Sequence, residues 1–288
     1  MSWRTIVVSN TSKLDYQLGF MVVRGEETIK VHINEIEMVI VESTAVSFTA
    51  YLMNELIKNK VKVIFCDEKR NPSCELLPYY GSHDTSAKIR HQMGWSRENK
   101  EAIWTEIVTE KIRQQAEHLH DLNKAEAELL YHYIGEVAFG DQTNREGHAA
   151  KVYFNALFGK DFSRTEDNPI NAALNYGYSI ILSLFTREVV SNGYITQIGL
   201  FHDNMFNQFN LACDLMEPYR PIVDRYVVSM KPEQFRKEEK HTMIMMLNEE
   251  VKINGRREVL GKAVKLYTRS VFDALNDQDI SLIKFYEL

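Results

Sequence analysis

The first 80 residues contain short runs of apolar and β-branched residues bounded by turn-forming residues. Runs of this length and composition are typical of β-strands. Two of them are separated only by a short polar segment around Gly25, which predicts a hairpin. Leu52 and Leu56 fall on one face of a predicted helix over residues 50–58, and residues 71–73 predict a turn. The predicted strands cover residues 3–8, 19–24, 28–33, 36–41, 61–66 and 76–80.

The pattern changes after a small polar cluster at residues 81–86. From there to Ala274 apolar residues recur at helical spacing, for example at Ile103, Ile107 and Val108. Strands followed by helices predict an α+β fold, with an N-terminal β-rich, β-sandwich-like domain before a larger all-α domain. The predicted helices are interrupted at Gly140, residues 159–161, residues 192–193, Pro232 and residues 254–255.

The length of 288 residues allows two domains. We expect the β-rich domain at residues 1–83, a linker at residues 84–95 and the helical domain at residues 96–288. Hydrophobic residues make up 44% of the chain and charged residues 26%, which is ordinary for a soluble globular protein.

The stretch at residues 168–186 carries no charge but includes a proline and three asparagines, so it predicts a buried helix rather than a membrane span. No apolar leader segment opens the chain, and we therefore expect a cytoplasmic protein.

Charge is distributed unevenly along the chain. The net charge is -6, which argues against a surface coated for nucleic acid as a whole. Residues 230–270 nevertheless hold ten lysines and arginines against six acidic residues, a local charge of +4. This segment is compatible with a local basic face within an acidic protein, with a solvated helix surface as the simpler alternative. Under the family resemblance described below, its candidate DNA-binding residues are Lys231, Arg236, Lys237, Arg256 and Arg257.

The common catalytic motifs are absent from the sequence. It has no GxSxG elbow, no GxxxxGK[ST] phosphate loop, no HExxH and no glycine-rich dinucleotide turn. Cys66, Cys74 and Cys213 form no CxxC pair and have no neighbouring base that would indicate a thiol nucleophile. Serine hydrolases, nucleotide hydrolases and zinc proteases are therefore disfavoured.

Two places in the helical half carry single side chains suited to metal chemistry. Glu146 stands at a predicted helix start among Gly147, Ala149 and Ala150, whose small side chains let another element approach closely. His202 ends an apolar run, and a neutral imidazole there suits a divalent ion. Each has a simpler explanation, because acids favour helix N-termini and a histidine can be hydrogen-bonded within the core.

A third place is a proline-punctuated segment that begins at Asp214. Asp214 and Glu217 are three residues apart and share one face of a helical turn. Pro218 biases Glu217 away from the helical region, and Arg220 can pair with Asp224 four residues later. The alternative is a helix junction with a surface ion pair.

Taken together, two carboxylates and one imidazole form a mixed oxygen and nitrogen donor set. This set suits Mg²⁺ or Mn²⁺ better than a structural Zn²⁺. Such an ion activates an attacking oxygen and neutralises charge on a phosphate, as phosphodiester chemistry requires.

Four sequence blocks carry a family resemblance. They are Arg-Glu-Gly at 145–147 with Tyr-Phe at 153–154, Asn-Ala-Ala-Leu-Asn-Tyr-Gly-Tyr at 171–178, Gly-Leu-Phe-His at 199–202, and Asp-Leu-Met-Glu-Pro-Tyr-Arg-Pro-Ile-Val-Asp at 214–224. In their order and spacing these blocks resemble the CRISPR-associated spacer-acquisition integrases, the Cas1 family, and are closest to the type II branch that accompanies Cas9.

The resemblance implies a catalytic metal triad of Glu146, His202 and Glu217, which would hold Mg²⁺ or Mn²⁺. Many members have aspartate at the last position, and glutamate keeps the same donor type. Asp214 would be an auxiliary carboxylate, and Tyr176 would lie near the site without being catalytic. The resemblance also implies a homodimer formed through the β-rich domain, and a heterohexamer with a small ferredoxin-like companion protein.

The implied activity is metal-dependent DNA integration. The 3′-hydroxyl of a short double-stranded DNA (the protospacer) would attack a phosphodiester at the CRISPR repeat, and water in its place would give an endonuclease. Two alternatives stay open from the residues alone. One is a non-enzymatic DNA-binding scaffold subunit of the same kind of complex, and the other is a hydrolase of small phosphorylated metabolites.

Overall fold

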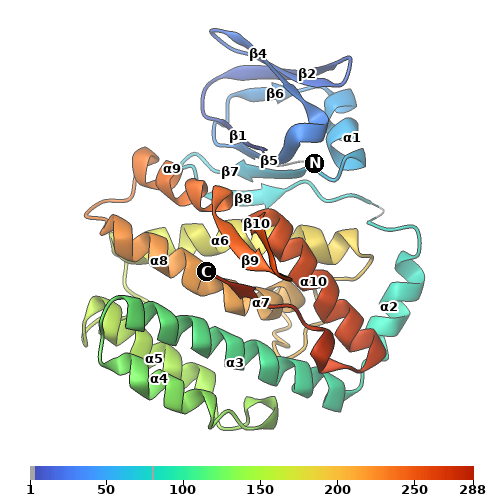
Figure 1. The fold of residues 1–288 in the computed structure, drawn as a ribbon. Coiled ribbons are helices and arrows are strands. Elements are labelled where there is room, and N and C mark those ends of the chain that lie inside the picture. Colours follow the sequence, from blue (N-terminus) through green and yellow to red (C-terminus); the bar gives the residue numbers. More distant parts are fainter. Residues whose placement is uncertain (1–3, 80) are drawn as a thin grey trace. The chain divides into compact units, whose positions relative to one another are not determined.

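The computed structural model describes residues 4–79 and 81–288, and the chain divides into two units, Met1–Gly81 and Ser82–Leu288 (Figure 1). The first unit contains two four-stranded sheets. In one sheet the order is β1-β5-β7-β8, with β1, β5 and β7 parallel and β8 antiparallel to β7. The other sheet has the order β4-β3-β2-β6, in which β2, β3 and β4 form an antiparallel meander. The strands are Arg4–Val8 (β1), Ser12–Gln17 (β2), Phe20–Arg24 (β3), Thr28–His32 (β4), Ile36–Val41 (β5), Val46–Phe48 (β6), Lys62–Cys66 (β7) and Pro72–Glu75 (β8).

The two sheets face each other across one apolar core. Leu14 and Met21 come from the second sheet and Val39 and Val63 from the first, and all four are fully buried. Helix α1 (Ala50–Lys58) adds apolar side chains at helical spacing, and the Thr49 side chain accepts a hydrogen bond from its first turn. This unit is therefore the β-sandwich-like part of an α+β fold.

The predicted strands and helix of this unit are confirmed, with two corrections. Residues 71–73 are not a turn alone, because Pro72–Glu75 pairs antiparallel with β7. Residues 76–79 form no strand. Two short strands, β2 and β6, were not recognised from the sequence because their polar residues hide the alternation. Residues 1–3 and 80 lie outside the described residues.

The second unit is built mainly of helices, as predicted. Helix α2 lies within residues 84–95, where the sequence suggested a linker. The helices are Thr85–Met93 (α2), Arg97–Asp121 (α3), Glu126–Ile134 (α4), Arg145–Phe158 (α5), Pro169–Ser191 (α6), Asn210–Met216 (α7), Arg220–Met230 (α8), Lys237–Met245 (α9) and Leu260–Asp277 (α10), with 3-10 turns at Phe139–Asp141 (η2), Glu217–Tyr219 (η3), Met246–Asn248 (η4) and Ile280–Leu282 (η5).

Two long helices organise this unit. Helix α3 packs against α4, α5, η3 and α8, and α6 packs against α7, α8, α9 and α10 (Figure 1). Helix α6 contains most of the uncharged stretch at residues 168–186 that was predicted to be a buried helix. It begins after Asn168, whose side chain accepts from the Asn171 backbone N–H at 2.8 Å. Within the described residues, no helix is both long and apolar enough to cross a membrane.

The C-terminal part of this unit also contains a small sheet, which corrects the prediction of an almost purely helical domain. Strands β9 (Glu250–Ile253), β10 (Arg256–Val259) and β11 (Tyr286–Glu287) pair antiparallel in the order β10-β9-β11. Val251 and Ile253 are buried and Lys252 between them is exposed, which is a strand period rather than a helical one. Asn254 and Gly255 both have positive φ and form the hairpin turn.

Candidate active site

Glu146 lies in the first turn of α5, as the sequence predicted. The helix begins after Asn144, which adopts a left-handed conformation with φ 53°. The carboxylate of Asp141 accepts the backbone N–H groups of Arg145 at 2.7 Å and Glu146 at 3.1 Å, so it satisfies two donors at the helix start. A Cβ at position 147 would lie 2.8 Å from the side-chain amide of Asn144, so a larger residue there would require that amide to move.

Glu217 lies between α7 and α8, in the 3-10 turn η3. Its φ of -53° and ψ of -44° are helical, so the expectation that Pro218 would move it out of the helical region is wrong. The chain passes from α7 through η3 into α8 with helical dihedral angles, and the hydroxyl of Tyr286 donates to the Pro218 carbonyl at 2.9 Å. Packing on both sides therefore overrides the local bias of a residue before proline.

A lysine that the sequence reading did not single out joins the two glutamates. The ammonium of Lys111, from α3, donates to Glu146 Oε1 and to Glu217 Oε2. The other oxygen of Glu217 accepts from Arg220 Nε at 2.8 Å. Burial alone would raise the pKa of Glu217, but Arg220 and Lys111 outweigh it and lower that pKa to about 2. The structure thus brings Glu146 and Glu217 to a common point, with a cation between them.

His202 lies in the loop between α6 and α7, where Asp214 fixes it. The Asp214 side chain is fully buried and accepts the backbone N–H groups of Leu200 at 2.6 Å, Phe201 at 3.1 Å and His202 at 3.1 Å. Its Oδ1 also lies 2.5 Å from His202 Nδ1. A Cβ at Gly199 would come within 2.4 Å of the His202 carbonyl oxygen and 2.6 Å of Asp214 Oδ2, so only glycine permits this turn.

The imidazole of His202 is not a core histidine, because its side chain is 41% exposed. The hydrogen bond to Asp214 raises its pKa, against the opposing effect of burial. The edge of the ring also contacts Trp104, at 5.8 Å between ring centroids, and Trp104 stacks on Phe201 at 4.6 Å with an interplanar angle of 3°. These contacts hold the ring in one orientation.

Arg220 pairs with Glu217 rather than with Asp224, which corrects the expected ion pair. Its guanidinium lies over the Tyr178 ring, 4.7 Å from the centroid, and Asp224 is buried and accepts from the Tyr178 hydroxyl. The alternative of a surface ion pair is therefore wrong as well. Tyr176 contacts the ring of Phe235, with the centroids 5.5 Å apart. This contact does not test whether Tyr176 lies near the proposed metal site, and that placement stays a prediction.

Among the described residues, the structure brings the two glutamates of the predicted donor set together around a lysine but does not group His202 with them. Two carboxylates converge on one cation, and an imidazole whose Nδ1 is bonded to a carboxylate keeps Nε2 for a metal. In residues 4–79 and 81–288, no three histidine, cysteine, aspartate or glutamate side chains are grouped as a ready metal centre.

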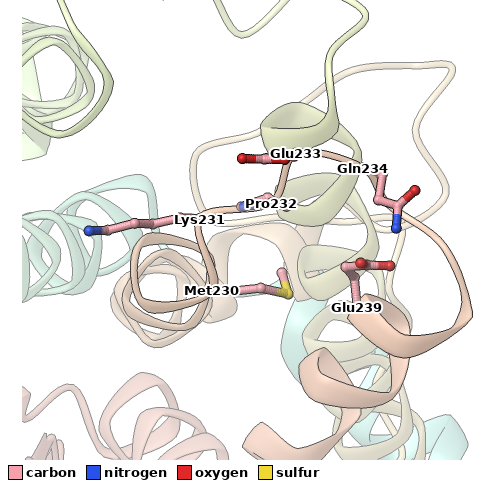
Figure 2. Close-up of a pocket in the computed structure, with 6 residues that line it drawn as sticks. All are labelled: Met230, Lys231, Pro232, Glu233, Gln234 and Glu239. Atoms are coloured by element: carbon pink, nitrogen blue, oxygen red, sulfur yellow. The ribbon is translucent and has the colours of Figure 1, made fainter.

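The predicted basic residues occupy different surroundings. Lys231 ends α8 in a left-handed conformation beside a pocket of about 480 Å³ at the turn into α9. Figure 2 shows its ammonium pointing away from Glu233, Gln234 and Glu239, and the two acids make this pocket a poor site for phosphate. Arg256 and Arg257, by contrast, are exposed on β10.

Comparison with known proteins gives consistent matches. The family model described as CRISPR associated protein Cas1 matches residues 6–261. The CRISPR-associated endonuclease Cas1 of Neisseria meningitidis serogroup C is 31% identical over 295 residues, covering 100% of this chain and 97% of the relative.

Two solved structures share the fold. A casposase bound to integration product has a TM-score of 0.77 at 18% identity, covering 96% of this chain and 91% of that chain. A chain of a Cas6-RT-Cas1–Cas2 complex has a TM-score of 0.72 at 17% identity, covering 97% of this chain and 36% of that chain. These two likenesses support the predicted α+β fold class.

Proposed function

The chain belongs to the CRISPR-associated Cas1 family and is an endonuclease and integrase of CRISPR adaptation, and we propose that Glu146, His202 and Glu217 form its metal-dependent active site. The family expected from the four sequence blocks is confirmed, and the Neisseria relative fits the expected type II branch. The observation that supports the site is the convergence of Glu146 and Glu217 on one cation.

Each proposed ligand has a partner that orients it. Asp214 holds Nδ1 of His202, so that Nε2 is the nitrogen available to a metal. Arg220 fixes one oxygen of Glu217 and leaves the other directed at the shared point. We propose Mg²⁺ or Mn²⁺ because carboxylate oxygens with one imidazole suit these ions. When bound, the ion would activate the attacking oxygen and neutralise charge on the phosphate.

The substrates and partners follow from the family. We propose that the 3′-hydroxyl of a short double-stranded DNA attacks a phosphodiester of the CRISPR repeat, and that water in its place gives hydrolysis. We further propose a homodimer formed through residues 1–83, with residues 96–288 as the catalytic part. We also propose a small ferredoxin-like companion protein in a heterohexamer. The solved Cas6-RT-Cas1–Cas2 complex, one chain of which shares this fold, includes Cas2, which is in keeping with a Cas partner.

The metal site is tested by Mn²⁺ titration calorimetry on the full chain. We expect the wild type to bind Mn²⁺ and Glu146→Ala to lose measurable binding, because a carboxylate ligand is removed. Glu126→Ala, which removes an exposed acid from the first turn of α4, should bind like the wild type. Binding that does not depend on Glu146 would instead indicate a non-enzymatic scaffold.

A gel assay on branched DNA separates the integrase from a hydrolase of small phosphorylated metabolites.

We propose that the basic residues Lys231, Arg236, Lys237, Arg256 and Arg257 contact the DNA backbone. Replacing Arg256 and Arg257 together with alanine should weaken DNA binding and reduce the slope of log K against log salt by about 2, because two phosphate contacts are lost. Binding is measured by fluorescence anisotropy at several salt concentrations. The matched control is Lys124→Ala with Lys160→Ala, two exposed lysines of the same unit. Unchanged affinity and slope in the arginine variant would remove these residues from the interface.

A further inference from the structure

Lys111 is a buried lysine whose partners are both proposed metal ligands. Its side chain is 7% exposed, and it extends from α3 toward α5 and η3, the two elements that carry Glu146 and Glu217. The ammonium donates to Oε1 of one acid and to Oε2 of the other. It therefore lies where a cation shared by the two carboxylates would lie.

The charges around these carboxylates are already balanced. Glu146 and Glu217 contribute two negative charges, and Lys111 and Arg220 contribute two positive charges in direct contact with them. Glu217 is 6% exposed, and leaving it without a cation would be strongly unfavourable, because a buried charge needs a partner. Glu146 is 28% exposed, so solvent partly screens its charge. The negative charges of the two acids are thus already neutralised by Lys111 and Arg220. A divalent ion that binds the same oxygens must therefore displace the ammonium of Lys111 from them.

We propose that Lys111 is a built-in counter-ion that holds the two glutamates together in the metal-free protein and competes with the divalent ion for their oxygens. The inference rests on the proposed metal site. A counter-ion role and a purely structural role of Lys111 predict different effects of its removal on metal affinity. If Lys111 only supported the fold, its loss would leave metal affinity unchanged or weaken it. If it competes with the metal, its loss strengthens metal binding.

The experiment compares the wild type with Lys111→Met, whose unbranched side chain is one atom shorter than that of lysine and carries no charge. We expect the variant to bind Mn²⁺ at least about tenfold more tightly by titration calorimetry. In EDTA its Tm should fall by roughly 5 °C, because the buried Glu217 and the partly exposed Glu146 then share one cation, Arg220. Saturating Mn²⁺ should raise the Tm of the variant by more than it raises that of the wild type.

The matched control is Lys124→Met, just after the same helix. Lys124 is an exposed lysine, so its loss should change Mn²⁺ affinity less than about twofold. Equal or weaker Mn²⁺ binding by Lys111→Met would overturn the inference and leave the proposed function intact. A wild type that binds no Mn²⁺ would overturn both.

A double variant keeps the proposal testable if Lys111→Met does not fold. Lys111→Met with Glu146→Gln removes one charge of each sign and leaves Glu217 paired with Arg220. We expect this protein to fold, with a Tm in EDTA close to that of the wild type. A double variant that is no more stable than Lys111→Met would show that the lysine is not the counter-ion of Glu146, and the proposal would be wrong.

Discussion

Replacing His202 with alanine is expected to lower DNA strand joining in Mn²⁺ by at least about 100-fold while the protein stays folded. The imidazole is the nitrogen donor of the proposed site, and the two glutamates alone would hold the ion less tightly and less rigidly. The fold should tolerate the change because the side chain is 41% exposed. Asp214 would still accept the three backbone N–H groups of the loop. The measurement is a gel assay of strand joining, with circular dichroism to confirm folding.

The matched control for this experiment is His120→Ala. His120 is an exposed histidine near the end of α3, so its removal changes the histidine content without touching the site. The control should join DNA like the wild type. A folded His202→Ala protein with near-wild-type joining would refute the role of His202 and, with it, the metal triad.

Much of the fold follows from local patterns in the sequence. The strands β5 and β7 and the helix α1 are recognisable because their apolar residues follow one period and their ends carry turn or capping residues. The sequence predicts a break between helices where the hairpin of β9 and β10 lies, because Asn254-Gly255 is typical both of helix ends and of hairpin turns. The alternation of Val251, Lys252 and Ile253 is the signal that distinguishes the two, but it spans too few residues to decide alone.

The candidate site is less visible in the sequence than the fold. Glu146, His202 and Glu217 were identified from the chemistry of their side chains and from a family resemblance, because no periodicity connects such distant residues. Lys111 carries a local signal that was overlooked. It falls four residues after Ile107 on the buried face of α3, where a charged side chain needs an oppositely charged partner.

The conformation of Glu217 shows why a local rule can fail. The steric effect of Pro218 is a preference of the isolated chain, and it is modest beside the packing of a whole helix junction. Tyr219 is fully buried against the rings of Phe185 and Tyr286, at 5.3 and 4.6 Å between centroids. Contacts between residues so distant in sequence fix the helical path and cannot be inferred from the neighbours of Glu217 alone.

Asp214→Asn is expected to reduce both stability and activity, in contrast to His202→Ala. The carboxylate of Asp214 accepts three backbone N–H groups and the imidazole, and all four bonds need an acceptor. The amide of asparagine offers only one oxygen, so at least one buried donor would face the amide nitrogen. We expect the free energy of unfolding to fall by about 3 kcal/mol in urea titrations. Strand joining should fall by about 10- to 100-fold, because the imidazole loses its orienting partner.

The same variant has a defined effect on pH dependence. Asp214 raises the pKa of His202, so the variant should move this pKa downward, as measured by NMR titration. A raised pKa in the folded state contributes stability below the unfolded value of about 6.5 and loses it as the pH rises through the folded value. The stability lost in Asp214→Asn should therefore be larger at pH 5 than at pH 8. Asp203→Asn, an exposed acid of the same loop, should change neither quantity. If Asp214→Asn behaves like this control, Asp214 does not hold the imidazole in place.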